Sequence, residues 1–190
     1  MKKGLLIVVS GPSGVGKSTV REAYMKDESL KLSYSISMTT RKPREGETDG
    51  VDYFFVNKRR FKMAVKNGEL LEHAEFVGNY YGTPVSYVEK LRNAGRNVIL
   101  EIEINGALQV MEKCPDCLSI FILPPSLEEL EARIRGRNSE SEEVIQGRLD
   151  KARHEMSFVD RYKYQVVNHD IQQCADEIGA IIKAEMEKEE

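Results

Sequence analysis

The chain has 190 residues, of which 41% are hydrophobic and 31% are charged, and its formal net charge is −3. That length suits a single domain that buries a sizeable core, and the slightly acidic balance gives none of the basic field that nucleic-acid-binding proteins carry. No apolar run reaches the length of a membrane span. Neither a nucleic acid nor a membrane is therefore expected as a partner.

The first expected element is a buried strand at residues 5–9, an apolar run rich in β-branched residues. It leads into residues 11–18, Gly-Pro-Ser-Gly-Val-Gly-Lys-Ser, which match the phosphate-loop pattern G-x-x-x-x-G-K-[ST] in full. The glycines of such a loop let backbone N–H groups turn toward an anion at a helix N-terminus, and residues 19–26 can continue as that helix. Lys17 is expected to reach the β- and γ-phosphates and the Ser18 hydroxyl to bind Mg²⁺.

The N-terminal Met-Lys-Lys-Gly and the apolar residues after it superficially resemble a signal peptide. That interpretation fails because cleavage there would destroy the phosphate loop. The three cysteines are an odd number and make no disulfide framework. Cys114 and Cys117 form a C-x-x-C, which leaves a half zinc site or a redox pair as alternatives. With only Cys174 besides, reduced thiols in a cytoplasmic protein are the favoured interpretation.

Residues 33–56 alternate in polarity around a polar stretch, which is typical of short antiparallel strands rather than of a βαβ unit. A short helix at 61–66, ended by Asn67-Gly68, and strands at 70–77 and 80–83 follow. These elements predict a small α+β insertion.

The strand–helix alternation then resumes. Ser126 and Glu129 form a capping box at the start of a helix, and residues 135–141 are a polar break. The pattern predicts a parallel sheet with helices on both faces, with ligands at the carboxyl ends of its strands. The expected strands are 97–102, 118–123 and 164–167, and the expected helices include 85–93, 142–157 and 171–187.

Arg41 and Arg44 lie three residues apart in Ser-Met-Thr-Thr-Arg-Lys-Pro-Arg, residues 37–44. Guanidinium forks bind phosphate oxygens bidentately, and Pro43 stiffens the segment. The alternative is a solvated basic loop.

Glu72 lies on an expected strand, where a carboxylate can accept hydrogen bonds from the N1–H and exocyclic amine of guanine, a donor pair that adenine lacks. The hydroxyls of Thr83 and Ser37 can complete recognition at the guanine oxygen. Tyr53 and Tyr81 can bind a phosphate, although tyrosines at strand spacing are more often packing residues.

Glu101 and Glu103 end a buried strand, where phosphate-loop proteins hold a carboxylate beside Mg²⁺ and the nucleotide; an ordinary polar strand end is the alternative. Arg133, Arg137 and Arg148 flank the polar break. They can close over a triphosphate and stabilise the transferred phosphoryl group, or they can be surface charges.

Over essentially its full length, the chain resembles the guanylate kinase family. The fingerprint S-x-T-T-R-x-P-R-x-G-E-x-x-G-x-D-Y stands at residues 37–53 with every position kept, and Leu-Glu-Ile-Glu at 100–103 also matches. The resemblance implies a single domain with a P-loop three-layer α/β/α fold around a parallel core sheet. Its core would comprise about 1–34 and 84–190, with a GMP-binding insertion at about 35–83 and a lid at about 135–150.

The resemblance further implies reversible transfer of the γ-phosphoryl group of MgATP to GMP or dGMP, in cytoplasmic purine nucleotide metabolism. The cofactor would be Mg²⁺, bound with ATP through Ser18. Implied ATP-binding residues are Gly11, Pro12, Ser13, Gly14, Val15, Gly16, Lys17, Ser18, Thr19 and Asn168. Implied GMP-binding residues are Ser37, Arg41, Arg44, Glu47, Tyr53, Glu72, Tyr81, Thr83, Glu101 and Glu103. Implied catalytic residues are Lys17, Arg41, Arg133, Arg137 and Arg148.

The chain departs from the family pattern in four places, the last of which covers two residues. Thr83 occupies a position where some members have serine, and it retains the hydroxyl. Glu103 occupies a position where many members have aspartate, and its carboxylate reaches one methylene further. Asn105 occupies a position where glutamine is usual in the family. In the lid, Asn-Ser at 138–139 replaces the family's common Gly-Thr.

Three other classes compete with this interpretation. A ribose-bisphosphate kinase would share the phosphate loop but would not need Glu72 and Thr83, and a protein-binding module would have no need to keep Lys17. A GTPase is disfavoured because no Asn-Lys-x-Asp motif follows the third strand. The sequence does not fix an oligomeric state.

Overall fold

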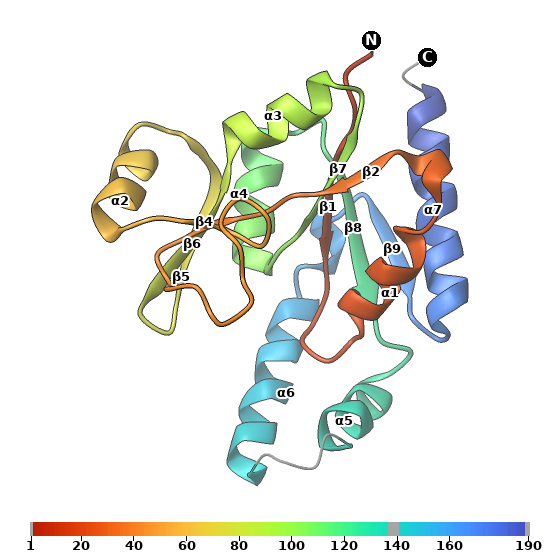
Figure 1. The fold of residues 1–190 in the computed structure, drawn as a ribbon. Helices are drawn as coiled ribbons and strands as arrows, with labels where there is room; N and C mark the ends of the chain where they lie inside the picture. Colours follow the sequence, from red (N-terminus) through yellow and green to blue (C-terminus); the bar gives the residue numbers. More distant parts are fainter. Residues whose placement is uncertain (1, 137–140, 189–190) are drawn as a thin grey trace. The chain divides into compact units, whose positions relative to one another are not determined.

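The computed structural model describes residues 2–136 and 141–188. It is a mixed α/β fold whose five-stranded parallel sheet has the order β2-β7-β1-β8-β9 and is flanked by helices (Figure 1). This confirms the fold class expected from the strand–helix alternation. The strands are β1 (Leu6–Ser10), β2 (Leu32–Tyr34), β7 (Asn97–Glu101), β8 (Leu118–Leu123) and β9 (Tyr164–Val167).

The chain divides into two compact units, each built from several segments. We call the first the acceptor unit, because it holds the implied GMP-binding residues apart from Glu101 and Glu103, and the second the donor unit, because it holds the phosphate loop. The acceptor unit comprises Met1–Leu6, Leu32–Leu100 and Asn105–Cys117, and the donor unit comprises Ile7–Lys31, Glu101–Ile104 and Leu118–Glu190.

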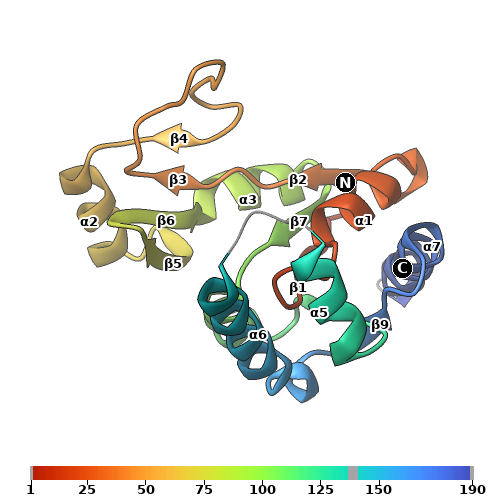
Figure 2. The ribbon, with the colours of Figure 1, turned by 90° about the horizontal axis from the view of Figure 1, so that it is seen from below.

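The acceptor unit contains a second sheet in the order β4-β3-β6-β5, with α2 beside β5 (Figure 2). Its small core is formed by Met38, Phe61, Ala64 and Leu70, against which Tyr80 and other half-buried side chains pack. The elements of this unit are β3 (Met38–Thr39), β4 (Phe54–Phe55), α2 (Lys58–Lys66), β5 (Leu70–Phe76), β6 (Asn79–Pro84), α3 (Val85–Asn93) and α4 (Ile104–Lys113).

One strand pairing in this unit differs from the expectation. β3 and β4 run parallel, with Met38 opposite Phe54, and only β6 pairs antiparallel to β3. The physical reason is the length of the connection, because the two strands are joined by residues 40–53 and not by a tight turn. Parallel neighbours need a long crossover of this kind, whereas antiparallel strands can be joined by a hairpin.

In the donor unit, β1, β8 and β9 pair in parallel, and further helical segments accompany the phosphate-loop helix. Ser126 caps α5 by accepting a hydrogen bond from the Glu129 backbone N–H, as the capping box predicts. α5 and α6 pack together through Leu130, Ile134, Leu149 and neighbouring apolar side chains (Figure 2). The helical elements are α1 (Lys17–Tyr24), η1 (Glu28–Leu30), α5 (Leu127–Arg135), α6 (Glu142–Met156), η2 (Val159–Arg161) and α7 (Ile171–Lys188).

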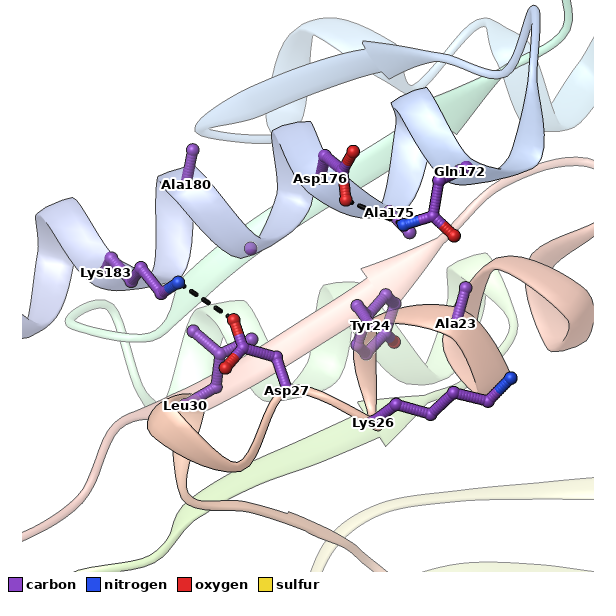
Figure 3. Close-up of a pocket in the computed structure, with 11 residues that line it drawn as sticks. Ala23, Tyr24, Lys26, Asp27, Leu30, Gln172, Ala175, Asp176, Ala180 and Lys183 are labelled. Atoms are coloured by element: carbon purple, nitrogen blue, oxygen red, sulfur yellow. Dashed lines mark hydrogen bonds and ion pairs between the residues drawn. The ribbon is translucent and has the colours of Figure 1, made fainter.

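α7 packs against α1 and η1, and the three enclose a pocket of about 450 Å³ (Figure 3). Small residues of α7 line it, including Ala175 and Gly179, and a Cβ added at Gly179 would have a Leu30 methyl as its nearest neighbour. An ion pair of 2.8 Å joins Lys183 of α7 to Asp27 at the edge of the pocket. This packing anchors the helix that begins at the phosphate loop.

Two further expectations depend on which residues the structure describes. Within residues 2–136 and 141–188, no helix is both long and apolar enough to cross a membrane. Arg137, predicted as a lid arginine, and Asn138 lie outside the described residues.

Candidate active site

The phosphate loop joins the buried strand β1 to α1 in the donor unit. Gly14 and Gly16 have φ angles of +87° and +94°, a backbone conformation that side-chain-bearing residues rarely adopt. Gly16 is the residue that caps α1, so the chain passes directly from the loop into the first turn of the helix. Ser18 and Thr19 lie on that turn, and Thr19 is exposed. The arrangement is that of an anion site at a helix N-terminus.

Lys17 is held within the loop that precedes it. Its ammonium group donates to the carbonyl oxygens of Gly11 at 2.5 Å and Pro12 at 3.1 Å. Burial lowers the pKa of Lys17, while the charges of Glu155, Glu101 and Glu103 act to raise it. The lysine therefore lies in a covered position near several carboxylates, which are the groups that keep a buried ammonium charged.

Glu155 of α6 is a residue that the sequence analysis did not single out. Its carboxylate is buried and accepts a 3.2 Å hydrogen bond from the backbone N–H of Ser13 in the phosphate loop. A signal existed, since Glu155 continues the buried stripe Ile145, Leu149 and Ala152 on α6. An acid on an otherwise apolar helix face needs a buried partner.

Two predicted arginines and Asn168 contact the same loop. Arg148 donates to the Ser13 hydroxyl at 3.2 Å, and Arg133 donates to the carbonyls of Val15 and Asn168 at 3.4 and 3.1 Å. The buried Asn168 amide donates to the Val15 carbonyl at 2.8 Å. A pocket of about 570 Å³ opens beside them, lined by Gly14, Val15, Gly16, Arg133, Gly136, Asn168, His169, Asp170 and Ile171.

The two carboxylates at the end of β7 each pair with a cation of the donor unit. Glu101 lies 3.2 Å from Arg21 of α1, and Glu103 lies 3.0 Å from Lys151 of α6. Glu101 is the more covered of the two, with 12% of its side chain exposed against 64% for Glu103. The carboxylate charge of Glu101 is therefore better shielded from solvent than that of Glu103.

In the acceptor unit, the structure brings Glu72 of β5 and Thr83 of β6 together. The Thr83 hydroxyl donates a 2.6 Å hydrogen bond to Glu72 Oε1, and both residues are buried. Burial raises the pKa of Glu72, although the hydrogen bond from Thr83 and the charge of Lys113 act in the opposite direction. A buried carboxylate with capacity to accept further hydrogen bonds is a recognition group for a pair of donors.

A second cluster of predicted residues surrounds the Arg41 guanidinium. Arg41 forms a bidentate ion pair with Glu47, and its guanidinium carbon lies 5.2 Å from the centroid of the Tyr53 ring. Tyr81 packs edge-on against Tyr53 at 6.2 Å between centroids. Glu47 and Tyr81 both act to raise the pKa of Arg41.

Arg44 and Ser37 lie near this cluster in the chain but are held differently. The Arg44 side chain is exposed, and its backbone N–H donates to Glu47 Oε2 at 2.7 Å. Ser37 is half-buried, and its carbonyl accepts the backbone N–H of Phe54. The sequence analysis gave no role to Thr39 and Thr40, whose hydroxyls bond to the backbone of Tyr80 and so fix the segment before Arg41.

The cysteines show no cross-link. Cys114, Cys117 and Cys174 are free thiols, and burial raises the pKa of Cys117 to about 11 and of Cys174 to about 12. Across the described ranges, no three or more His, Cys, Asp or Glu side chains gather as metal ligands. The three free thiols agree with the interpretation of the cysteines as reduced.

Comparison with known proteins gives the family. The guanylate kinase family model matches residues 3–185. A guanylate kinase of Bacillus cereus is 53% identical over 97% of this chain and 90% of its own length. A guanylate kinase of Listeria innocua is 51% identical over 100% of this chain and 92% of its own length.

A solved structure agrees with these sequence relatives. The crystal structure of guanylate kinase from Anaplasma phagocytophilum superimposes with a TM-score of 0.73 at 38% identity, covering 97% of this chain and 87% of that one. The family model and the full-length relatives therefore assign this chain to the guanylate kinase family, whose members are nucleoside monophosphate kinases that transfer phosphate from ATP to GMP.

Proposed function

We propose that this chain transfers the γ-phosphoryl group of MgATP reversibly to GMP or dGMP, giving ADP and the diphosphate, in cytoplasmic purine nucleotide metabolism. The proposal needs no nucleic acid and no membrane. Residues of about 35–83 would bind the acceptor, residues of about 135–150 would form the lid, and about 1–34 and 84–190 would form the core. The observation that carries the choice of acceptor is the buried Glu72 carboxylate held by Thr83.

Glu72 recognises guanine in this proposal by accepting from the N1–H and the exocyclic amine. Adenine presents an acceptor at N1 and carries no amine at C2, so the same carboxylate would face a lone pair and lose both hydrogen bonds. The Thr83 hydroxyl has one proton, which it donates to Glu72 Oε1. Thr83 therefore orients the carboxylate, and the donor to the guanine oxygen is left to Ser37.

The acceptor phosphate is bound in this proposal by Arg41, Arg44, Tyr53 and Tyr81. Its second pKa is near 6, so it is largely dianionic at neutral pH and needs no general base. One of its oxygens attacks the γ-phosphorus, the bond to the bridging β–γ oxygen breaks, and ADP leaves. Because no proton moves, catalysis is a problem of positioning and of charge.

The donor triphosphate is bound by residues 11–19, Lys17 among them, and the adenine lies beside Asn168. Support for this placement comes from the pocket of about 570 Å³ that Asn168 lines together with the loop glycines. Arg133 and Arg148 contact the loop and stabilise charge on the transferred group. Arg137 would join them, and closure of the lid would exclude water and so limit ATP hydrolysis.

Mg²⁺ fits the donor set around Lys17. Oxygen ligands are what this ion prefers, and the Ser18 hydroxyl and the carboxylates of Glu101 and Glu103 would supply them. Held there together with ATP, the ion would offset charge on the β- and γ-phosphates. Glu101 and Glu103 can then serve the ion or, as the resemblance implies, GMP.

The test is an ADP-release assay with GMP, dGMP, AMP and UMP as acceptors, run on the wild type and on Glu72→Gln. We expect release with GMP and dGMP, and little with AMP or UMP. In Glu72→Gln one acceptor becomes a donor, so the GMP rate should fall and the preference for GMP over AMP should narrow. Activity on AMP or on a sugar phosphate but not on GMP would refute the proposed acceptor.

A further inference from the structure

Helix α4 touches β5 through one face of the helix, at positions three and four residues apart. Gln109 binds both backbone groups of His73: its Oε1 accepts the His73 N–H at 3.1 Å, and its Nε2 donates to the His73 carbonyl at 3.0 Å. The Lys113 ammonium donates to the carbonyls of Leu70 and Leu71 at 3.1 and 2.8 Å. Together these contacts bracket Glu72 on both sides along the strand.

β5 needs these partners because of its place in the sheet. It is one of the two edge strands of the order β4-β3-β6-β5, and its register with β6 shifts between Leu70 and His73. A bulge of this kind leaves backbone groups without ladder partners and re-aims the side chain at the irregularity. Glu72 is in the irregular stretch, and α4 supplies hydrogen bonds to the backbone of the residues on either side of it.

The third residue of this face, Gly106, lies against the carboxylate itself. A Cβ added at Gly106 would be 2.8 Å from Glu72 Oε2 and 3.3 Å from its Cδ. Real Cβ atoms essentially never make contacts below 3.0 Å, so one of the two groups would move. The carboxylate is the end of a side chain, whereas Gly106 is buried helix backbone, so the carboxylate is the group that would be displaced.

We infer that α4, through Gly106, Gln109 and Lys113, sets the position of the Glu72 carboxylate and thereby the affinity and selectivity for the guanine base. These are positioning residues, because they act through Glu72. The inference rests on the proposed role of Glu72 in binding guanine, and the experiment separates the two.

Gly106→Ala tests the steric part, with calorimetric titration of GMP and of ATP as the readout. Displacing a charged hydrogen-bonding group should raise the Kd for GMP about ten- to a hundredfold while leaving the Kd for ATP unchanged. Alanine is the better helix former, so the melting temperature should not fall. The matched control is Gly179→Ala in α7, which adds the same methyl to a buried helix position whose nearest atom is 3.7 Å away.

A double mutant asks whether the effect passes through Glu72. Glu72→Ala should weaken GMP by itself, and adding Gly106→Ala to it should weaken GMP no further, because the colliding carboxylate is gone. If Glu72→Ala leaves GMP affinity unchanged, the proposed guanine role of Glu72 is wrong. If Glu72→Ala weakens GMP but Gly106→Ala does not, the positioning inference is wrong and the proposed function stands.

Gln109→Met provides a second variant in case Gly106→Ala does not fold. It keeps the length of the side chain and removes both hydrogen bonds to His73. We expect a rise of several-fold in the Kd for GMP, again absent in the Glu72→Ala background. Wild-type GMP affinity in Gln109→Met would overturn the part of the inference that concerns the backbone.

Discussion

The guanidinium of Arg41 and the carboxylate of Glu47 form a bidentate ion pair, with distances of 2.9 Å from Nη1 to Oε2 and 2.8 Å from Nη2 to Oε1. Only 15% of the Arg41 side chain and 19% of the Glu47 side chain are exposed. The hydrogen bonds from Arg41 and from the Arg44 backbone hold the pKa of Glu47 at about 2. Glu47 was expected to bind GMP directly, but its oxygens already bind the arginine segment, so we now expect it to act by orienting Arg41.

Glu47→Gln should therefore weaken GMP without affecting ATP. The amide keeps the shape but cannot accept both arms of the fork, so Arg41 loses its fixed orientation. Steady-state kinetics should show KM for GMP raised about tenfold, with KM for ATP unchanged. Glu45→Gln, at an exposed position in the same loop, should behave as wild type. An unchanged KM for GMP in Glu47→Gln would show that the ion pair is dispensable.

Several element boundaries were predictable because local signals mark them. The observed α3, β8 and β9 have the predicted bounds, and α5 starts at its predicted cap. Residues 104–113 carried no predicted element, yet they form α4. Ile104, Ala107, Leu108 and Met111 do show helical spacing, but Asn105 and Gly106 near the start are weak helix formers and hide it.

Site residues were predictable from the sequence only where they belong to a contiguous motif. The phosphate loop is such a case, because its glycine spacing is local. The support that Glu155 gives to Ser13 joins residues 142 positions apart, and the contact of Arg21 with Glu101 spans 80. Spacing rules do not reach such pairs. The same limit applies to the contact of α4 with Glu72, which depends on a strand irregularity that no local sequence signal marks.

Lys17→Ala should abolish most turnover and leave GMP binding nearly intact. Lys17 belongs to the donor unit, where it is bound to the loop carbonyls of Gly11 and Pro12. Removing its charge takes away a donor to the transferred phosphoryl group, which should cost about 10²–10³-fold in kcat. Calorimetry with GMP on the same variant provides the control. An equal loss of GMP affinity would mean that the donor and acceptor residues are misassigned.

The thiols should react slowly with iodoacetamide in the folded protein at neutral pH. The thiolate is the reactive form, and burial raises the pKa of Cys114, Cys117 and Cys174. Cys114 is the least buried and should be alkylated first, and all three should react quickly in urea. Mass spectrometry gives the order. Rapid native alkylation of Cys117, or one zinc per chain by elemental analysis, would favour the redox or metal alternative for the C-x-x-C.

Glu185→Gln should destabilise the protein at neutral pH but not in strong acid. Glu185 is buried on α7, and its carboxylate accepts from Lys163 at 2.7 Å, Tyr164 at 2.6 Å and Lys188 at 2.7 Å. These three hydrogen bonds, the one from Lys163 above all, hold the pKa of Glu185 at about 2, below the ordinary 4.5. A depressed carboxyl pKa contributes stability that is fully present above the unfolded value and is lost as pH falls through the folded value.

The free energy of unfolding, measured with urea, should therefore be about 1 kcal/mol lower in Glu185→Gln at pH 7, a modest value because the lysine partners are half exposed and screened. The difference from wild type should stay constant down to about pH 5, shrink between about 4.5 and 2, and vanish below that, since the protonated glutamate then resembles glutamine. Glu187→Gln, at an exposed position of the same helix, should show little difference at any pH. A gap between Glu185→Gln and wild type that persists unchanged to about pH 2 would mean that packing, and not the charge, makes Glu185 stabilising.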